Sequence, residues 1–449
     1  MVAHVDGTHL SILWAVPFAG LLLSIALMPL LAAPLWHRHF GKVTAAWAMA
    51  FLAPFTLVFG VPAAGTGFLH ALLAEYIPFI LLLTALFTVA GGIHIRGNLR
   101  GGPGLNTALL ATGAVLASFM GTTGASMLLI RPLIRANERR RRRAHIVVFF
   151  IFIVSNIGGS LTPLGDPPLF LGFLKGVDFF WTMSHILPET LFCLAVLLAL
   201  FYGVDTWYLA RDGTLPSDPA PDIRQFGFDG ARNFWLLGTI ALLVLMSGVW
   251  KSGVVFHLMG VEVGLPGLLR DLGLVVVIFI SLRTTPAQVH RDNQFSWAPM
   301  LEVAKLFAGI FLTILPVIAM LKAGPQGPFG AIIAAVTRAD GTPSPAMYFW
   351  ATGLLSSLLD NAPTYMVFFN TAGGDPKVLM TTLAPTLAAI SAGAVFMGAN
   401  SYIGNAPNLM VKAIAEERGV KMPSFFGYMA WSCAVLLPLF AVVTFIWFI

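Results

Sequence analysis

Two acidic residues, Asp166 and Asp360, lie inside long apolar stretches of this 449-residue sequence, and each has proline close behind it. In a chain that crosses a membrane, an aspartate at mid-depth is costly enough to be a functional candidate by default. Burial raises the pKa of a carboxyl group and a bound cation lowers it, so such an aspartate can exchange a proton for a cation. The alternative is structural, because an aspartate at a helix start also caps backbone N–H groups.

Neutral oxygen-bearing side chains surround both acids. Amide and hydroxyl oxygens suit Na⁺ and are poor ligands for a transition metal. We therefore expect proton and cation exchange at Asp166 and Asp360, with Na⁺ as the metal ion there. No cofactor is expected besides transported Na⁺ or Li⁺ and H⁺. The candidate cation or substrate ligands around the acids are Ser155, Asn156, Thr162, Asn361, Asn400, Ser401 and Asn405.

Two segments that carry these residues match each other. Residues 159–168 align without gaps to 398–407, so that glycines, a hydroxyl, an acid or its amide, and a proline coincide. Glycine loosens a helix and proline removes a backbone donor, which frees peptide groups in the middle of a span. Freed carbonyls suit a cation and freed N–H groups suit an anion, so both chemistries stay open, and kinks that serve packing are the structural alternative. The expected helix breaks are Gly159, Gly165, Pro167, Pro363, Gly398, Gly404 and Pro407.

The composition predicts the elements that must position these residues. Hydrophobic residues make up 57% of the chain and charged residues only 10%, with a mean hydropathy of +0.84, whereas soluble proteins carry roughly a quarter charged residues. The apolar runs are long and continuous and do not alternate, which predicts helices and not barrel strands. At about 20 residues per crossing they leave room for about ten spans. The fold class is an all-α polytopic membrane protein, and a soluble enzyme is excluded.

Positive charge predicts how the spans are threaded. Arg96 and Arg100 form one basic cluster, residues 131–143 form another, and a single apolar run separates them. The positive-inside rule places both clusters in the cytoplasm, which requires the run between them to enter and return as a re-entrant hairpin. This first hairpin covers about 105–134 and turns at the polar residues 121–126. A second hairpin, about 346–369, breaks at Asp360 and enters from the opposite face.

With the hairpins included, the chain divides into two inverted repeats, an architecture of many secondary transporters. The first repeat covers 1–205, with its broken span at about 146–174. A proline-rich cytoplasmic linker follows at 206–232, and the second repeat covers 233–449, with its broken span at about 378–411. The protein is expected in the inner (cytoplasmic) membrane. Because ten is an even number of crossings, both termini are expected on the same side, which is the outside. Residues 253–264 are expected to form an interfacial helix, and acids near span ends, among them Glu75 and Asp205, are expected in solvated or interfacial positions.

Several functions are excluded by missing motifs. No G-x-x-x-x-G-K-[ST] sequence is present, so an ion gradient is the expected energy source. The enzyme signatures H-E-x-x-H and G-x-S-x-G are also missing, so neither an intramembrane enzyme nor a soluble one is expected. The five arginines 139–143 follow a membrane segment and are expected to contact lipid headgroups and not nucleic acid. The expected partners are the lipid bilayer, small inorganic cations and, in the alternative below, carboxylates.

At Ser155-Asn156-Ile157-Gly158-Gly159 through Gly165-Asp166-Pro167, and at Asp360-Asn361-Ala362-Pro363, the sequence resembles the ion transporter superfamily. Within it, these motifs look like NhaD-type sodium/proton antiporters and the CitMHS-like citrate transporter family. The resemblance implies a scaffold of outer spans and a moving transport part built from the hairpins and broken spans. It also implies that Asp166 and Asp360 exchange Na⁺ or Li⁺ for H⁺, and by analogy that the protein forms a homodimer.

Two transport hypotheses follow. The first is a sodium(lithium)/proton antiporter that works by alternating access. The alternative is a sodium-coupled di- or tricarboxylate symporter of the citrate type, with the anion at facing half-helix N-termini. Mid-membrane acids serve antiport directly but repel an anion. The dicarboxylate members of the superfamily carry Ser-Asn-Thr signatures, and neither is intact in this chain, because Ile157 follows Ser155-Asn156 and the second pair reads Asn400-Ser401.

Overall fold

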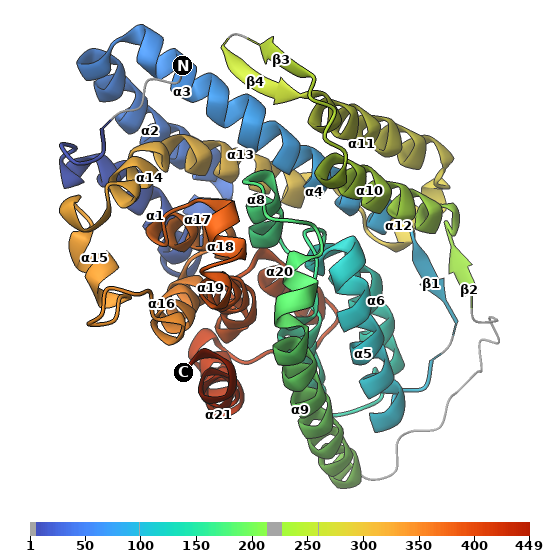
Figure 1. Cartoon of the computed structure of the whole chain (residues 1–449). Helices are drawn as coiled ribbons and strands as arrows, with labels where there is room; N and C mark the ends of the chain where they lie inside the picture. Colours follow the sequence, from blue (N-terminus) through green and yellow to red (C-terminus); the bar gives the residue numbers. More distant parts are fainter. Residues whose placement is uncertain (1–5, 98, 213–226, 259) are drawn as a thin grey trace.

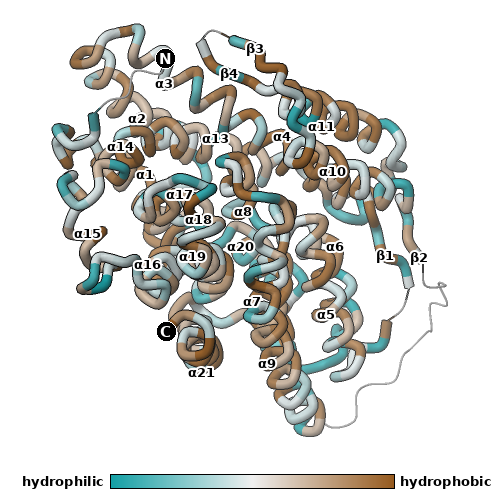
Figure 2. Tube along the Cα trace, in the orientation of Figure 1, coloured by the Kyte–Doolittle hydropathy of each residue, from teal (hydrophilic) through white to brown (hydrophobic). Residues whose placement is uncertain are grey.

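Long apolar helices make up most of the computed structural model, which describes residues 6–97, 99–212, 227–258 and 260–449 (Figure 1). Within these residues, eight helices are long and apolar enough to cross a membrane, and the bent pair α13–α14 would make nine. Hydrophobic residues dominate these helices along their length (Figure 2). The predicted fold class, an all-α polytopic membrane protein, is confirmed. The number of crossings and the inverted relation of the repeats stay predictions.

The helices of the first half follow the order that the apolar runs predict. The N-terminal group consists of a 3₁₀ turn (Ile12–Ala15), α1 (Val16–Leu31), α2 (Ala33–Phe59), α3 (Val61–His70), a π-helical turn (Ala71–Tyr76) and α4 (Ile77–Gly91). The second group consists of α5 (Pro103–Met120), α6 (Thr122–Ala136), α7 (Ala144–Ile153), a 3₁₀ turn (Ile157–Gly159), α8 (Pro167–Leu174) and α9 (Trp181–Asp212). Helix α9 continues beyond the predicted repeat boundary at 205.

The second half has a similar succession of elements. Its first group consists of α10 (Arg232–Val249), α11 (Leu265–Thr284), α12 (Ala287–Asp292), α13 (Ala298–Thr313), α14 (Leu315–Lys322), a 3₁₀ turn (Gly324–Gln326) and α15 (Gly330–Ala335). Its second group consists of α16 (Pro345–Leu358), α17 (Asn361–Thr371), α18 (Pro376–Met380), α19 (Ala384–Met397), a 3₁₀ turn (Gly398–Asn400), α20 (Ala406–Glu417), α21 (Phe425–Val443) and a π-helical turn (Thr444–Phe448).

Two short antiparallel strand pairs join the helices. Strand β1 (His94–Arg96) pairs with β2 (Gly227–Asp229), and β3 (Val255–Leu258) pairs with β4 (Val261–Gly264). The interfacial helix predicted over 253–264 is therefore wrong. Valine and phenylalanine, which favour strands, are concentrated there, and Gly260 takes the positive φ of +86° that the tight turn requires. Residues 213–226 of the predicted linker lie outside the described part of the chain.

Helix pairs occupy both segments predicted as hairpins. Helices α5 and α6 pack against each other and meet at Gly121, whose φ of +81° is open to glycine at little cost. Helices α16 and α17 likewise pack together, and the chain turns between them at Leu359 and Asp360. Two further breaks interrupt helices: residues 160–166 lie between the 3₁₀ turn Ile157–Gly159 and α8, and residues 401–405 lie between the 3₁₀ turn Gly398–Asn400 and α20. These four interruptions bring polar residues to the middle of an otherwise apolar molecule.

The buried apolar side chains of the described residues form two large clusters. The first joins α5, α6, α7, α9, α16, α19 and α21. The second joins α1, α4, α8, α10, α11, α13 and α14. The two clusters adjoin at α8, because Leu169 of this helix belongs to the first cluster and Phe170 to the second. The polar residues of the first break lie directly before α8.

Candidate functional site

The Asp166 carboxylate accepts hydrogen bonds from three segments of the chain. Thr122 Oγ1, at the start of α6, donates to Asp166 Oδ1 at 2.9 Å. Asn405 Nδ2, in the second helix break, donates to the same oxygen at 3.3 Å. Asn361 Nδ2, at the start of α17, donates to Oδ2. The side chain is buried, with 2% of Asp166 exposed, so both hairpins and both breaks meet at one carboxylate.

Local sequence explains why these residues stand at helix starts. Pro167 is the first residue of α8 and Pro407 the second of α20. Proline is accepted at these positions because the first N–H groups of a helix have no intrahelical partner. Pro363 lies in the first turn of α17 in the same way. The three prolines thus begin new helices, and none of them kinks a helix interior.

Glycine allows the backbone of each break to fold back on itself. Gly159 closes one 3₁₀ turn and Gly398 opens the other. A Cβ added at Gly165 would lie 2.1 Å from the Gly159 carbonyl oxygen, and one at Gly404 would lie 2.6 Å from the Gly398 carbonyl oxygen. Both distances are shorter than a Cβ atom and a carbonyl oxygen can approach, so the two breaks require glycine at matching positions. The gap-free alignment of 159–168 with 398–407 pairs the same residues.

Asp360 has a different local role from Asp166. Its Oδ1 accepts the N–H of Ala362 at 3.0 Å and so caps α17. Asp166 stands at the equivalent position before α8 but makes no capping bond with its side chain. Of the two alternatives that the sequence left open, capping describes Asp360 in this structure. Asp166 is engaged by side chains from other segments instead.

Both acids line one central cavity of about 110 Å³. The rest of its wall is mainly apolar and comes from α4, α13 and α20, with Phe87, Met300 and Met410 among the lining residues. Within the described residues, no lysine, arginine or histidine lines it. A cavity of this size holds ions and a few waters, whereas sites for drug-sized ligands occupy about 300–1,000 Å³.

A second layer of amides holds Asn405 in place. Asn405 Nδ2 also donates to the Ser155 carbonyl oxygen at 3.1 Å and to Asn156 Oδ1 at 3.2 Å. Asn156 Nδ2 in turn donates to Asn408 Oδ1 at 2.8 Å. Asn408 closes the layer by donating to the carbonyls of Gly398 and Ser401, each at 2.9 Å. Within the described residues, the Asn156 side chain is therefore linked to Asp166 through Asn405, whereas the Ser155 hydroxyl pairs with the Ser126 hydroxyl at 2.9 Å.

The remaining predicted ligands bind the hairpins instead of Asp166. Thr162 Oγ1 donates to the Ser118 carbonyl oxygen, and Ser401 Oγ donates to the Ser357 carbonyl oxygen. Asn400 Nδ2 donates to Ser357 Oγ at 2.9 Å. Extended without a gap, the alignment of the two breaks pairs Ser118 with Ser357 and Thr162 with Ser401. These residues fasten each broken segment to the hairpin beside it.

Two residues at the site were not among the predicted ligands. Thr122 contacts Asp166 directly, and Asn408 supports the amide layer. A signal for Thr122 exists in the sequence, because the same gap-free alignment pairs it with Asn361, which was predicted. Asn408 follows Pro407 and so falls in the first turn of a helix, where a polar side chain is common.

Two amide oxygens near the breaks are free to accept a ligand. Asn361 Oδ1 and Asn400 Oδ1 are buried and have no hydrogen-bond partner in the described structure. Buried polar atoms are normally paired, and an unpaired one costs free energy. Within the same residues, no group of three or more His, Cys, Asp or Glu could hold a metal ion. A cation at this site would therefore take its oxygens from Asp166 and from neutral side chains such as Asn361.

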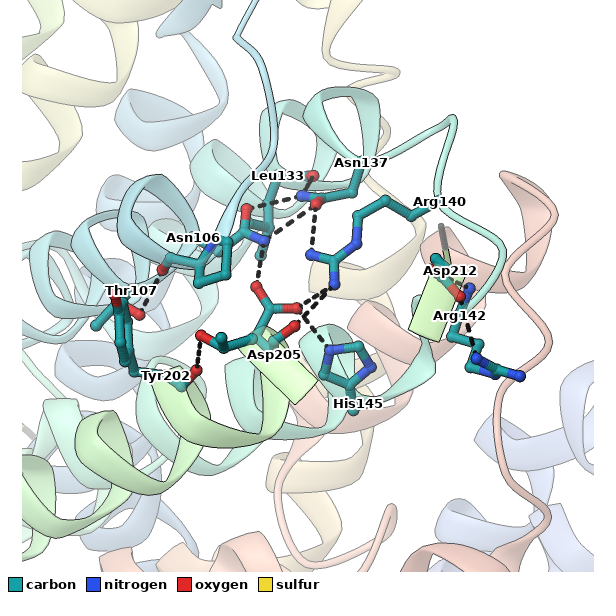
Figure 3. Close-up of polar contacts among 12 residues, drawn as sticks. Asn106, Thr107, Leu133, Asn137, Arg140, Arg142, His145, Tyr202, Asp205 and Asp212 are labelled. Atoms are coloured by element: carbon teal, nitrogen blue, oxygen red, sulfur yellow. Dashed lines mark hydrogen bonds and ion pairs between the residues drawn. The ribbon is translucent and has the colours of Figure 1, made fainter. Parts of the chain in front are cut away.

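A separate buried cluster lies around Asp205 of α9 (Figure 3). Arg140 Nη2 and His145 Nε2 contact Asp205 Oδ1 at 2.6 and 2.7 Å, and Asn106 donates to Oδ2 at 2.9 Å. Asp205 is 0% exposed and Arg140 3%. The expectation of a solvated Asp205 and a lipid-facing Arg140 is wrong. The arginine turns inward because a buried carboxylate needs a charged partner.

Comparison with known proteins gives a matching family and several related membrane proteins. A protein-family model described as "Putative citrate transport" matches residues 7–448. An uncharacterized transporter of Mycobacterium bovis is 26% identical over 343 residues, which cover 73% of each chain. A 46 kDa membrane protein of Mycobacterium leprae is 25% identical over 328 residues, or 71% of each chain.

Proposed function

The chain belongs to the putative citrate transport family and is a multi-pass membrane transporter, and from this premise we propose that it exchanges Na⁺ or Li⁺ for H⁺ at Asp166. The observation that carries the proposal is the buried Asp166 carboxylate, which accepts hydrogen bonds from Thr122, Asn361 and Asn405. One carboxylate can hold either a proton or a cation, so the two ions compete for one charge. Such competition is the minimal requirement of an antiporter.

The surroundings of Asp166 suit a cation better than an anion. The described lining of the central cavity carries two acids and no basic side chain. An incoming tricarboxylate would lack a counter-charge there and would face the negative charge of Asp166. The unpaired Asn361 Oδ1 supplies a neutral oxygen beside the carboxylate, which is the ligand type that Na⁺ prefers.

The way in which Asp166 joins the two halves supports a mechanism of alternating access. Its hydrogen-bond donors come from α6 in the first half and from α17 and the break before α20 in the second. A change in the charge of Asp166 therefore alters contacts between the halves at the same moment as it binds or releases an ion. This coupling would let protonation and cation binding favour different arrangements of the two halves.

A sodium-coupled symporter of citrate or a related carboxylate is the second candidate, because the family description names citrate. In that case the central cavity would have to enlarge, since about 110 Å³ is below the usual size of an organic-ligand site.

The test uses everted membrane vesicles in which a dye reports the proton gradient. We expect NaCl or LiCl, without any carboxylate, to collapse the gradient in the wild type and Asp166→Asn to abolish this response. Asp178→Asn makes the same chemical change at an exposed position and should leave the response intact. Normal exchange by Asp166→Asn would refute the assignment. Absence of any cation response, together with Na⁺-dependent uptake of labelled citrate or succinate, would establish the symporter instead.

A further inference from the structure

A second and larger cavity, of about 600 Å³, lies at the opposite end of α8 from Asp166. Its wall comes from residues 6–8, α2, α3, the π-helical turn before α4, the residue that follows α8, and the region of α14. Helices α8 and α14 both pack against α17 (Figure 1). The volume falls in the range of about 300–1,000 Å³ that is usual for small-molecule sites.

One ion pair crosses this cavity wall. Lys175 Nζ, directly after α8, donates to Glu75 Oε1 in the π-helical turn. Glu75 is only 5% exposed, so its expected solvated position is wrong, and its Oε2 has no partner in the described structure. A lysine ammonium has three N–H donors, and Glu75 uses one of them. Single π-helical turns inside α-helices are frequent at functional sites.

A second ammonium group faces the same cavity. Lys322, the last residue of α14, is exposed and has no ion pair or hydrogen bond within the described residues. The charges of Lys175 and of Glu75 both lie near enough to act on it. The Asp6 carboxylate at the cavity edge accepts from the N–H and Oγ1 of Thr8, at 3.0 and 2.6 Å. Glu75 forms its ion pair with Lys175, so no carboxylate of the described residues is in contact with the Lys322 ammonium group.

We propose that this cavity is a binding site for a small oxyanion, a carboxylate or a phosphate, held between Lys322 and Lys175. The proposal goes beyond ion exchange at Asp166 and does not depend on it. An oxyanion between two ammonium groups forms charge-assisted hydrogen bonds and relieves their mutual repulsion. Glu75 acts as an internal competitor, because its carboxylate already occupies one donor of Lys175. Removal of the Glu75 charge must then strengthen oxyanion binding, and removal of the Lys322 charge must weaken it.

The experiment uses the full chain in lipid nanodiscs and follows thermal unfolding by tryptophan fluorescence. The probes are the choline salts of citrate, succinate and phosphate, with choline chloride at equal ionic strength as reference. A ligand that binds the folded protein raises the unfolding midpoint in a saturable way. We expect at least one oxyanion to do so in the wild type, with binding at least tenfold weaker in Lys322→Gln, retained in Lys322→Arg and tighter in Glu75→Gln.

Two controls separate this site from other effects. Lys251→Gln removes an exposed lysine elsewhere and should bind like the wild type. Asp166→Asn should also keep oxyanion binding while it loses cation exchange, so the two proposals can fail independently. A response to carboxylates alone, or to phosphate alone, would identify the ligand within the proposed class. The proposal is overturned if chloride matches every oxyanion, if Lys322→Gln binds as tightly as the wild type, or if Asp166→Asn abolishes binding.

Discussion

At the scale of single residues, the proline at the second position of α8 explains why Asp166 makes no capping bond while Asp360 does. A capping aspartate accepts an N–H from the second or third residue of the helix that follows it. After Asp166 the second residue is Pro168, which has no N–H, and the N–H of the third, Leu169, is bonded to the Asp166 carbonyl oxygen at 3.1 Å. After Asp360 the second residue is Ala362, whose N–H the carboxylate accepts.

The Thr122 hydroxyl is the donor at Asp166 that can be removed with the least change in shape. We expect Thr122→Val to weaken the apparent Na⁺ affinity of exchange about tenfold or more, because a hydrogen bond to a charged group contributes about 1.5–3 kcal/mol. Thr122→Ser keeps the hydroxyl and should stay near the wild type. The measurement is the NaCl concentration for half-maximal collapse of the proton gradient in everted vesicles. Equal values for Thr122→Val and the wild type would remove Thr122 from the site.

At the scale of elements, the Asp205 cluster fixes the first hairpin and α7 against α9. Its donors come from α5, from the arginine run after α6 and from α7. Asn137, at the end of α6, exchanges two hydrogen bonds with Asn106 at 2.8 and 3.0 Å and so ties the two hairpin helices to each other. The far end of the hairpin from Asp166 is thus held by a buried charged network (Figure 3).

Loss of the Asp205 charge should destabilise the protein strongly. Asp205→Asn leaves Arg140 buried without a counter-charge, and breaking a buried pair in this way costs about 3–5 kcal/mol. The matched control is Asp229→Asn, because Asp229 pairs with Arg96 at 2.9 Å where both side chains are over a third exposed; exposed pairs contribute at most about 1 kcal/mol. The measurement is the midpoint of thermal unfolding in detergent, compared between Asp205→Asn and Asp229→Asn. Equal midpoints for the two variants would contradict a structural role of the buried cluster.

At the scale of the whole molecule, the sequence predicted what depends on local pattern and missed what depends on long-range contact. Apolar run length gave the helical fold, and glycine with proline gave the breaks at Gly165 and Pro407. The inward turn of Arg140 and the burial of Glu75 were missed because their partners, Asp205 and Lys175, are distant in the sequence. The β3–β4 pair was missed because a short apolar run suits a helix or a strand, and the pairing of the two runs decides between them.

The sidedness of the two cavities is the prediction that involves the whole molecule. Met300, near the start of α13, and Met410 of α20 line the central cavity. In the sequence they lie close to two further basic clusters, which the positive-inside rule places in the cytoplasm: Arg283, Arg291 and Lys305, and Lys412, Arg418 and Lys421. Thr66 of α3 lines the larger cavity, which the same topology places outside. After Cys193 and Cys433 are replaced, a membrane-impermeant maleimide should label Met410→Cys in everted vesicles and Thr66→Cys in right-side-out vesicles. Labelling of both cysteine variants from the same side would contradict the predicted topology, because the two cavities lie at opposite ends of α8.

If Met410→Cys were labelled in right-side-out vesicles and Thr66→Cys in everted ones, the fold would stand and its orientation in the membrane would be reversed. NaCl should slow the labelling of Met410→Cys alone, since only the central cavity contains Asp166.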